Sequence, residues 1–293
     1  MAAALKQRKW SMTAMSLDFS NIPDLAPLSR TIRALQAVAQ PLNIDCFLMG
    51  ATARDLMTHY AHGITIVRAT QDVDLAVTVK DWRAYETLRV ALITSGEFAS
   101  SPTAAHRFRH IKSGLPLDIV PFGGVERADR TVAWPPDGNP VFDCFGMREA
   151  SATTIHVELP EGVSTRAPAI PALVILKIVA WQDRKQTHPG RDARDLLLYF
   201  RHYMDCGNLD RASAEHGDLF EADDFDYVEA GVRLLARDVA ALLDHSATER
   251  LLTTLVPETD ENGRLLLAQQ SGGDLEGVRR LLEVFCDELA ANL

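Results

Sequence analysis

Two aspartates separated by one residue, Asp72 and Asp74, are the residues best placed to do chemistry in this sequence. They open the stretch 72–79, whose alternation of apolar and polar residues predicts a β-strand with both carboxylates on one face. Two like charges about 4 Å apart repel by about 4 kcal/mol at an effective dielectric near 20. A divalent cation between them would remove this repulsion, and Mg²⁺ (or Mn²⁺) accepts carboxylates together with phosphate oxygens. The alternative is an ordinary solvated sheet face.

Two further segments favour a phosphate-binding metal site. A short apolar run, 44–49, predicts a buried strand that stops at Gly50, and a helix is expected directly after it. Glycine lets the backbone approach a ligand, and the free N–H groups of a helix start favour phosphate. Farther along, Asp118 lies between Leu117 and Ile119 and points away from their apolar face. If its strand lies beside the Asp72 strand, three carboxylates converge; otherwise it is an exposed strand carboxylate.

Charged residues in two predicted helices form the next candidate set. Lys177 is the one charge in the apolar run 168–182, so it should either extend to water or meet an anion such as a triphosphate. Asp192 and Asp195 lie near the start of the following helix, where they could instead form structural ion pairs with Arg184. Arg191 and Asp195 have the spacing of an i,i+4 pair. Nucleotide phosphate or solvent could equally face a basic strand that carries Arg107, Arg109 and Lys112.

Taken in order, these blocks resemble the nucleotidyltransferase superfamily typified by DNA polymerase beta. The resemblance rests on Gly50–Asp55, Thr70–Leu75, Leu117–Ile119, Leu176–Arg184 and Arg191–Leu196. Within the superfamily the chain is most similar to the bacterial AbiEii/AbiGii-type toxin nucleotidyltransferases, over roughly residues 44–200. It departs from the usual pattern at Ala51, where a second Gly or Ser is common, and at Arg191, where many relatives have Lys.

The resemblance implies an α+β fold, in which a nucleotidyltransferase-type mixed sheet with flanking helices is followed by a C-terminal helical bundle. It implies transfer of a nucleoside monophosphate from an NTP to an acceptor, with release of pyrophosphate. The implied metal ligands are Asp72, Asp74 and Asp118, which are also the implied catalytic residues together with Lys177. The implied nucleotide contacts are Gly50, Ala51, Arg54 and Asp192.

The acceptor and the cellular role are left open by these residues. A tRNA 3′ end or a protein hydroxyl follows from the resemblance, as does a toxin whose partner is an antitoxin protein. A small-molecule acceptor is also open. The alternative from another class is a catalytically silent nucleotide-sensing or partner-binding protein with the same fold, which the departure at Ala51 favours. A haloacid-type phosphatase fits less well, because Leu75 and Ala76 follow the aspartate pair where a Gly-Thr is usual.

The remaining patterns predict an α/β part followed by a helical part. Ser113-Gly114 separates two short strand patterns, 106–112 and 115–121, and predicts an antiparallel hairpin. Residues 122–145 are rich in Gly and Pro and predict a loop, with one or two strands over 141–159. From residue 171 onward the patterns are helical. We therefore expect an N-terminal extension (1–23), a nucleotidyltransferase domain (24–165) and an acidic helical domain (166–293).

Composition narrows the classes of protein that remain. The 293 residues are 47% hydrophobic and 24% charged, which excludes a disordered chain. The sequence contains no apolar run long enough for a membrane span and no signal-peptide pattern, and its four cysteines show no CxxC spacing, so a cytoplasmic protein with reduced thiols is expected. The net charge is −10, and residues 198–293 hold 8 Lys and Arg against 20 Asp and Glu. Extended DNA binding is therefore not expected, because phosphate contacts depend on Lys and Arg.

Overall fold

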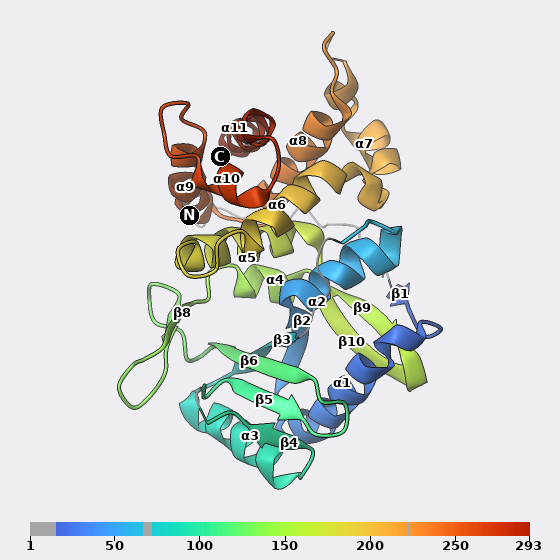
Figure 1. Cartoon of the computed structure of the whole chain (residues 1–293), viewed down its shortest axis with the longest axis vertical. Helices are drawn as coiled ribbons and strands as arrows, with labels where there is room; N and C mark the ends of the chain where they lie inside the picture. The colour runs from blue at the N-terminus through green and yellow to red at the C-terminus, as the bar shows by residue number, and fades with distance from the viewer. Residues whose placement is uncertain (1–15, 67–71, 103, 222) are drawn as a thin grey trace, which may run out of the picture.

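A five-stranded sheet carries the N-terminal half of the chain (Figure 1), in a computed structural model that describes residues 16–66, 72–102, 104–221 and 223–293. Its strand order is β2-β3-β6-β5-β4, with β2 antiparallel and β6 parallel to the central β3. The strands are β2 (Asp45–Met49), β3 (Val73–Val79), β6 (Pro116–Gly123), β5 (Arg107–His110) and β4 (Phe98–Ser100). The sheet is therefore mixed, as the sequence predicted.

The strand β3 shows why this sheet forms where it does. Its apolar residues Val73, Leu75, Val77 and Val79 are all buried, so the predicted alternation does face the core. The parallel neighbour β6 needs a crossover, which α3 (Trp82–Thr94) provides. The Asp81 side chain caps α3 by accepting a hydrogen bond from the Ala84 N–H at 2.8 Å.

The hairpin of β5 and β6 is antiparallel, as predicted, but its turn is longer than two residues. The His110 N–H donates to the Leu115 carbonyl, so four residues rather than Ser113-Gly114 alone connect the strands. Arg107 consequently lies opposite Asp118. A two-residue turn would have placed it opposite Val120.

A second sheet and a small hairpin contain the remaining strands of the described residues. The three-stranded sheet has the order β1-β9-β10, with β1 (Ser16–Asp18), β9 (Thr154–Leu159) and β10 (Val163–Pro168), and β10 packs beside β2. The helix α1 (Ala26–Ala39) contacts β10 and α3. Within the predicted loop 122–145 the chain forms β7 (Thr131–Ala133) and β8 (Val141–Asp143), and α4 (Met147–Ala152) follows. The strand β7 was not predicted, whereas β8 and β9 lie within 141–159, where one or two strands were expected.

The C-terminal half is helical and occupies the upper part of Figure 1. Its helices are α5 (Ile170–Arg184), α6 (Arg191–His202), α7 (Leu209–Glu215), α8 (Tyr227–Ala240), α9 (His245–Leu255), α10 (Leu266–Ser271) and α11 (Leu275–Ala291). This bundle confirms the predicted fold class. The change of element type falls between β10 and α5, and the division at residue 165 stays a prediction, as does the extension 1–23, most of which lies outside the described residues.

The two halves contact each other beside the sheet, through α5 and the short helix that follows β2. The helix α2 (Gly50–Asp55) begins at the end of β2 and continues as a π-helical turn, 56–60. It packs against β3 on one side and against α5 on the other, so β3, α2 and α5 meet at one place. None of the helices in the described part of the chain is long and apolar enough to cross a membrane.

Candidate active site

The three predicted carboxylates come together at the start of β3 and β6. Asp74 and Asp118 are direct partners in the parallel register of these strands, and Asp72 precedes Asp74 by two residues on the same face. One oxygen from each carboxylate can be chosen so that all three lie within 4.8 Å of one another. Three oxygen ligands at this spacing match the carboxylate donors that Mg²⁺ and Mn²⁺ prefer.

Gly50 leaves the space in which the carboxylate of Asp74 lies. Its φ is +64°, and a Cβ built on it would stand 1.9 Å from Asp74 Oδ2 and 2.7 Å from Asp74 Cγ. Any other residue would therefore displace Asp74 as well as strain the backbone. The next turn of α2 is tied to the same strand, because Thr52 Oγ1 donates to the Asp72 carbonyl at 3.1 Å. The strand-to-helix turn and the acidic pair thus form one unit.

The electrostatics of the cluster favour an added cation. Burial raises the pKa of Asp74 to about 6, and the charges of Asp72 and Asp118 add to this effect. Lys177 and Arg191 act in the opposite direction and do not cancel it. Asp72 Oδ1 is buried without a hydrogen-bond partner. An orphaned carboxylate oxygen and an unfavourable charge on Asp74 are what a metal bound between these residues would relieve, so the residues fit a divalent cation.

Two arginines from different elements contact the carboxylates. Arg107, on β5, donates from Nε and Nη2 to the two oxygens of Asp118 at 2.7 and 2.6 Å. Arg191, at the start of α6, has its Nη2 3.6 Å from Asp72 Oδ2. From the sequence alone, Arg107 is expected on a basic strand without an assigned partner, and Arg191 has the spacing to pair with Asp195. The structure instead directs both guanidinium groups to the acidic cluster.

Lys177 is buried in the wall between the two halves. It is 4% exposed, and its Nζ lies 3.1 Å from Asp192 Oδ1 and 2.5 Å from Asp195 Oδ2. Its ammonium group therefore does not extend to water, the alternative considered for an isolated lysine, because two carboxylates of α6 bind it. Arg184 donates to both oxygens of Asp192 at 2.6 and 2.8 Å. Although burial acts to raise it, these cations lower the pKa of Asp192 to about 2.

The predicted nucleotide contacts are only partly at the cavity surface. Gly50 lines the cavity beside the carboxylates, whereas Ala51, Arg54 and Asp192 are not among the residues that line it. Arg54 is buried and donates to Asp55 from Nε at 2.7 Å, and its Nη1 donates to Asp195. In this conformation Asp192 pairs with Lys177 and Arg54 pairs with Asp195, so both belong to the ion-pair network between α2, α5 and α6. Their role as nucleotide contacts stays a prediction.

A cavity of about 440 Å³ opens over the carboxylates and separates them from α5. Lys177, Arg107 and Arg191 line it together with the three aspartates. Apolar side chains line another part of it, from β6, β8, α4, α5 and the segment between β8 and α4: Val120, Phe142, Phe145, Met147, Leu173, Leu176, Val179 and Ala180. Polar residues complete the wall: His106, Asp143, Asp183, Arg184, Thr187 and His188. Its volume lies within the range of small-ligand pockets. The carboxylates therefore face a space that can hold a nucleotide.

His106 is a cavity residue that the sequence analysis assigned to no site. Its ring lies edge-on to Phe142 at 5.1 Å, and its Nδ1 is buried without a partner. Burial lowers the pKa of His106. Its position directly before Arg107 on a predicted strand was the available signal. Phe142 and Phe145 had none, because they lie where the predicted loop 122–145 overlaps the region 141–159, in which the position of the expected strands was not defined.

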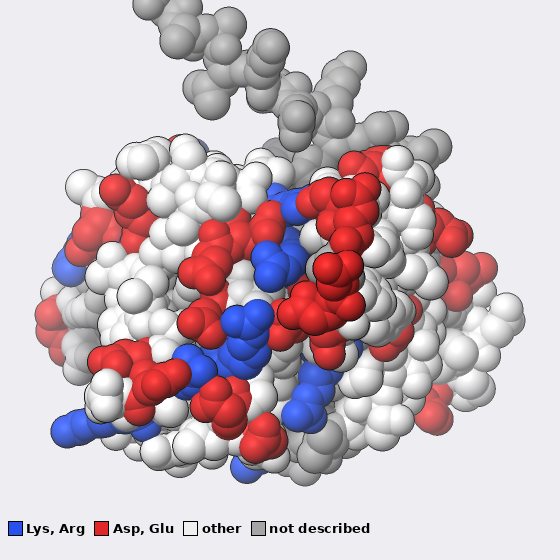
Figure 2. All heavy atoms as spheres, turned by 90° about the horizontal axis from the view of Figure 1, so that it is seen from above, with Lys and Arg blue, Asp and Glu red and all other residues white. Residues whose placement is uncertain are grey.

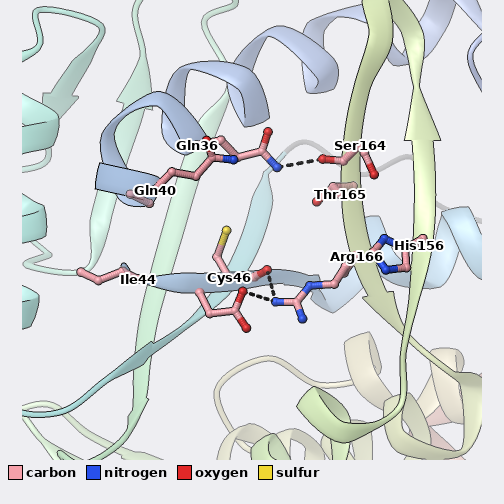
Figure 3. Close-up of a pocket in the computed structure, with 10 residues that line it drawn as sticks. Gln36, Gln40, Ile44, Cys46, His156, Ser164, Thr165 and Arg166 are labelled. Carbon is pink, nitrogen blue, oxygen red and sulfur yellow. Dashed lines mark hydrogen bonds and ion pairs between the residues drawn. The ribbon is translucent and has the colours of Figure 1, made fainter. Parts of the chain in front are cut away.

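A second, smaller cavity of about 180 Å³ lies between α1, β2 and β10 and is shown in Figure 3. Its polar groups are engaged with one another. Arg166 Nη2 donates to Asp45 and to the Cys46 carbonyl, and Gln36 Nε2 donates to the Ser164 carbonyl at 2.8 Å. Burial raises the pKa of the Cys46 thiol to about 11, so it is not a reactive thiolate at neutral pH. The larger cavity, which contains the three carboxylates, is therefore the candidate active site.

Comparison with known proteins gives one family match. Residues 33–266 match the family described as "Nucleotidyl transferase AbiEii toxin, Type IV TA system". The matched range contains the carboxylate cluster, Gly50 and Lys177. A search of curated proteins gives no match.

Solved structures give distant likenesses to nucleotidyltransferases. An antigenic nucleotidyltransferase-like protein from Paracoccidioides brasiliensis is 19% identical, with 66% of this chain and 90% of that chain covered and a TM-score of 0.39. ANT(2")-Ia in complex with adenylyl-2"-tobramycin is 16% identical, with 64% and 92% covered and a TM-score of 0.34. JHP933 from Helicobacter pylori is 16% identical, with 89% and 90% covered and a TM-score of 0.31.

Proposed function

Because the chain belongs to the AbiEii nucleotidyltransferase family, we propose that it transfers a nucleoside monophosphate from an NTP to an acceptor hydroxyl at this cavity. In this reaction the acceptor oxygen bonds to the α-phosphorus, and the bond from that phosphorus to the bridging oxygen of the β-phosphate breaks. Pyrophosphate leaves, and the hydroxyl proton passes to a base. The observation that supports the proposal most is the convergence of Asp72, Asp74 and Asp118 beneath the cavity.

Each residue has a proposed task in this reaction. Asp72, Asp74 and Asp118 would hold Mg²⁺ or Mn²⁺, which when bound supplies charge neutralisation for the triphosphate. Gly50 gives the phosphates close access to the backbone at the start of α2. Lys177 is held at the cavity wall by Asp192 and Asp195, so its ammonium is positioned before the leaving pyrophosphate develops charge.

The acceptor is proposed to be a tRNA 3′ end or a protein hydroxyl, as the family's toxin role implies. The surface over the helical half argues against a long nucleic-acid track. Figure 2 looks onto that half and shows acidic side chains spread over the face, with basic ones gathered near its middle. Residues 198–293 carry 20 Asp and Glu against 8 Lys and Arg. A tRNA would therefore present its end to the cavity without binding along this face.

A nucleotide-transfer assay tests the reaction. The full chain is incubated with Mg²⁺, each of the four α-labelled NTPs in turn, and total tRNA or a protein extract. We expect label to enter a macromolecule with one or more NTPs, and to vanish in the double variant Asp72→Ala plus Asp74→Ala. Arg109→Gln serves as the matched control, because Arg109 is exposed on β5 and does not line the cavity. Transfer that survives the double variant would exclude this site as the catalytic one.

A binding measurement and a growth experiment, read together with the transfer assay, address the silent alternative and the toxin role. Binding of NTP without pyrophosphate release would favour the catalytically silent protein. For the toxin role we expect that expression of the wild-type chain arrests bacterial growth and that the double variant does not. Release of the arrest by a protein encoded beside it would identify the antitoxin partner. Normal growth with active transfer would remove the toxin role and leave the enzyme.

A further inference from the structure

The cross-strand pair of Arg107 and Asp118 suggests how binding of the metal and binding of the nucleotide are coupled at this site. We propose that Arg107 forms an ion pair with Asp118 in the free protein. When a divalent cation and NTP bind together, Arg107 leaves this carboxylate and pairs with the triphosphate. The inference rests on the proposed function and adds to it a positioning residue that couples metal and nucleotide binding.

The geometry of the pair shows that both oxygens of Asp118 accept a hydrogen bond from Arg107 before any metal binds. Arg107 Nε and Nη2 donate to different oxygens of Asp118 at 2.7 and 2.6 Å, which is the parallel two-bond arrangement that guanidinium groups form best. The two residues are direct partners in the β5–β6 register, so the backbone holds them opposite each other. A cation that takes an oxygen of Asp118 as a ligand therefore lies close to the guanidinium charge and weakens these bonds by repulsion.

The charges at the cluster point to the same competition. The three carboxylates carry three negative charges, and Arg107 and Arg191 contact two of them in the free protein. A divalent cation placed among the carboxylates would lie close to both guanidinium groups and repel them. Asp74, the carboxylate between these two pairs in the cluster, is the one that their bonds do not reach. The two guanidinium groups thus neutralise part of the negative charge that a bound metal would otherwise neutralise.

Arg107 has both the freedom and a destination for the exchange. Its side chain is 48% exposed, whereas the side chain of Asp118 is 13% exposed, so the arginine can move and the aspartate remains in the sheet. Arg107 also lines the cavity above the carboxylates. A triphosphate in that cavity offers the guanidinium planar pairs of oxygens as good as those it leaves. The lost Arg107–Asp118 bonds are then replaced rather than simply broken.

Thermodynamic linkage gives the consequence. The cation alone weakens the Arg107–Asp118 pair without compensation, so it binds the free protein less tightly than it would without the guanidinium. In the presence of NTP the arginine regains a partner, so each ligand strengthens the binding of the other by the same factor. Couplings of this kind are typically about 5- to 150-fold. Removing the guanidinium should strengthen binding of the cation alone and weaken binding of the nucleotide.

Isothermal titration of the full chain with Mn²⁺, with and without a non-hydrolysable α,β-methylene NTP, tests the proposal. We expect Arg107→Gln to bind Mn²⁺ alone at least about 5-fold more tightly than the wild type, and to lose a similar factor of the coupling to the analogue. Arg109→Gln, two residues along the same strand, removes the same charge away from the cavity and should match the wild type. Arg107→Lys keeps the charge without the two-bond geometry and should lie between wild type and Arg107→Gln.

The outcomes separate this inference from the proposed function. Mn²⁺ affinity in Arg107→Gln equal to or weaker than in the wild type overturns the exchange, even if transfer activity is found. Equal tightening in Arg107→Gln and Arg109→Gln also overturns it, because net charge alone would then explain the change. The predicted titration pattern with no transfer to any acceptor leaves the exchange standing and removes the proposed reaction. A thermal melt of each variant confirms that it is folded during the titration.

Discussion

Gly50→Ala is the substitution that most directly probes how the fold positions the metal ligands. An alanine Cβ at this position would stand 1.9 Å from Asp74 Oδ2, 2.7 Å from its Cγ and 2.9 Å from its Cβ. Ordinary contact begins near 3.4 Å, so the carboxylate must retreat by roughly 1.5 Å. Since the overlap reaches back to the Cβ of Asp74, rotation of the carboxylate alone does not relieve it.

The expected cost has two separable parts. The left-handed φ of Gly50 costs about 1–2 kcal/mol for any residue with a Cβ, and the overlap adds about 1–3 kcal/mol. Gly63→Ala isolates the first part, because Gly63 has φ +71° and no atom of the described residues lies within 4 Å of the place that an alanine Cβ would take. A misplacement near 1 Å in an active site costs about 100-fold in rate. Gly50→Ala should therefore lose about 100-fold in transfer and most of its Mn²⁺ affinity.

Urea denaturation, Mn²⁺ titration and the transfer assay on the two variants provide the measurement. We expect Gly63→Ala to lose about 1–2 kcal/mol of unfolding free energy and to retain wild-type Mn²⁺ affinity and transfer. If Gly50→Ala behaved as Gly63→Ala does in all three assays, the close approach of Gly50 to Asp74 would not matter for the site, and the reasoning would be refuted.

Two further predictions concern buried charge. Since the pKa of Asp74 is about 6 in the folded protein and its ordinary value is 3.8, the folded state binds more protons between these values, and metal-free stability falls as pH rises through this window. Asn has no carboxyl group to titrate, so the unfolding free energy of Asp74→Asn in urea should rise relative to that of the wild type from pH 4 to 6, by at most about 3 kcal/mol. A difference that does not depend on pH would contradict this. Lys177→Met leaves two buried carboxylates of α6 without their shared cation and should lower the unfolding free energy by about 3–5 kcal/mol. Lys112→Met, which breaks the exposed pair with Glu97, should cost at most about 1 kcal/mol, and similar losses in both variants would argue against the buried network.

Periodicity was enough to predict the parts of the site that depend on one strand or helix. The alternation over 72–79 fixed which face of β3 carries Asp72 and Asp74, because a strand allows only two faces. The change from strand to helix patterns likewise identified the helical C-terminal half. Gly50 could be singled out because the backbone turns sharply from β2 into α2 there.

What could not be predicted depends on register and on contacts between distant segments. The partner of Arg107 is set by the length of the β5–β6 turn, and a two-residue difference in that turn changes the residue opposite it. The pairing of Arg184 with the next helix was one of the alternatives, and the structure places it on Asp192. The partners of Lys177 follow from how α5 packs on α2 and α6, which local patterns do not encode. Arg54 belongs to the same network through Asp195. Lys177, Arg54 and Asp192, which the sequence suggests as contacts to the nucleotide, therefore also form ion pairs within the protein.

The most direct test of the central claim is anomalous diffraction from crystals of the full chain grown with Mn²⁺ and a non-hydrolysable NTP analogue. The account predicts an anomalous peak coordinated by oxygens of Asp72, Asp74 and Asp118, with the triphosphate of the analogue in the cavity toward Lys177. A manganese peak away from these carboxylates, or a nucleotide bound outside this cavity, would contradict it.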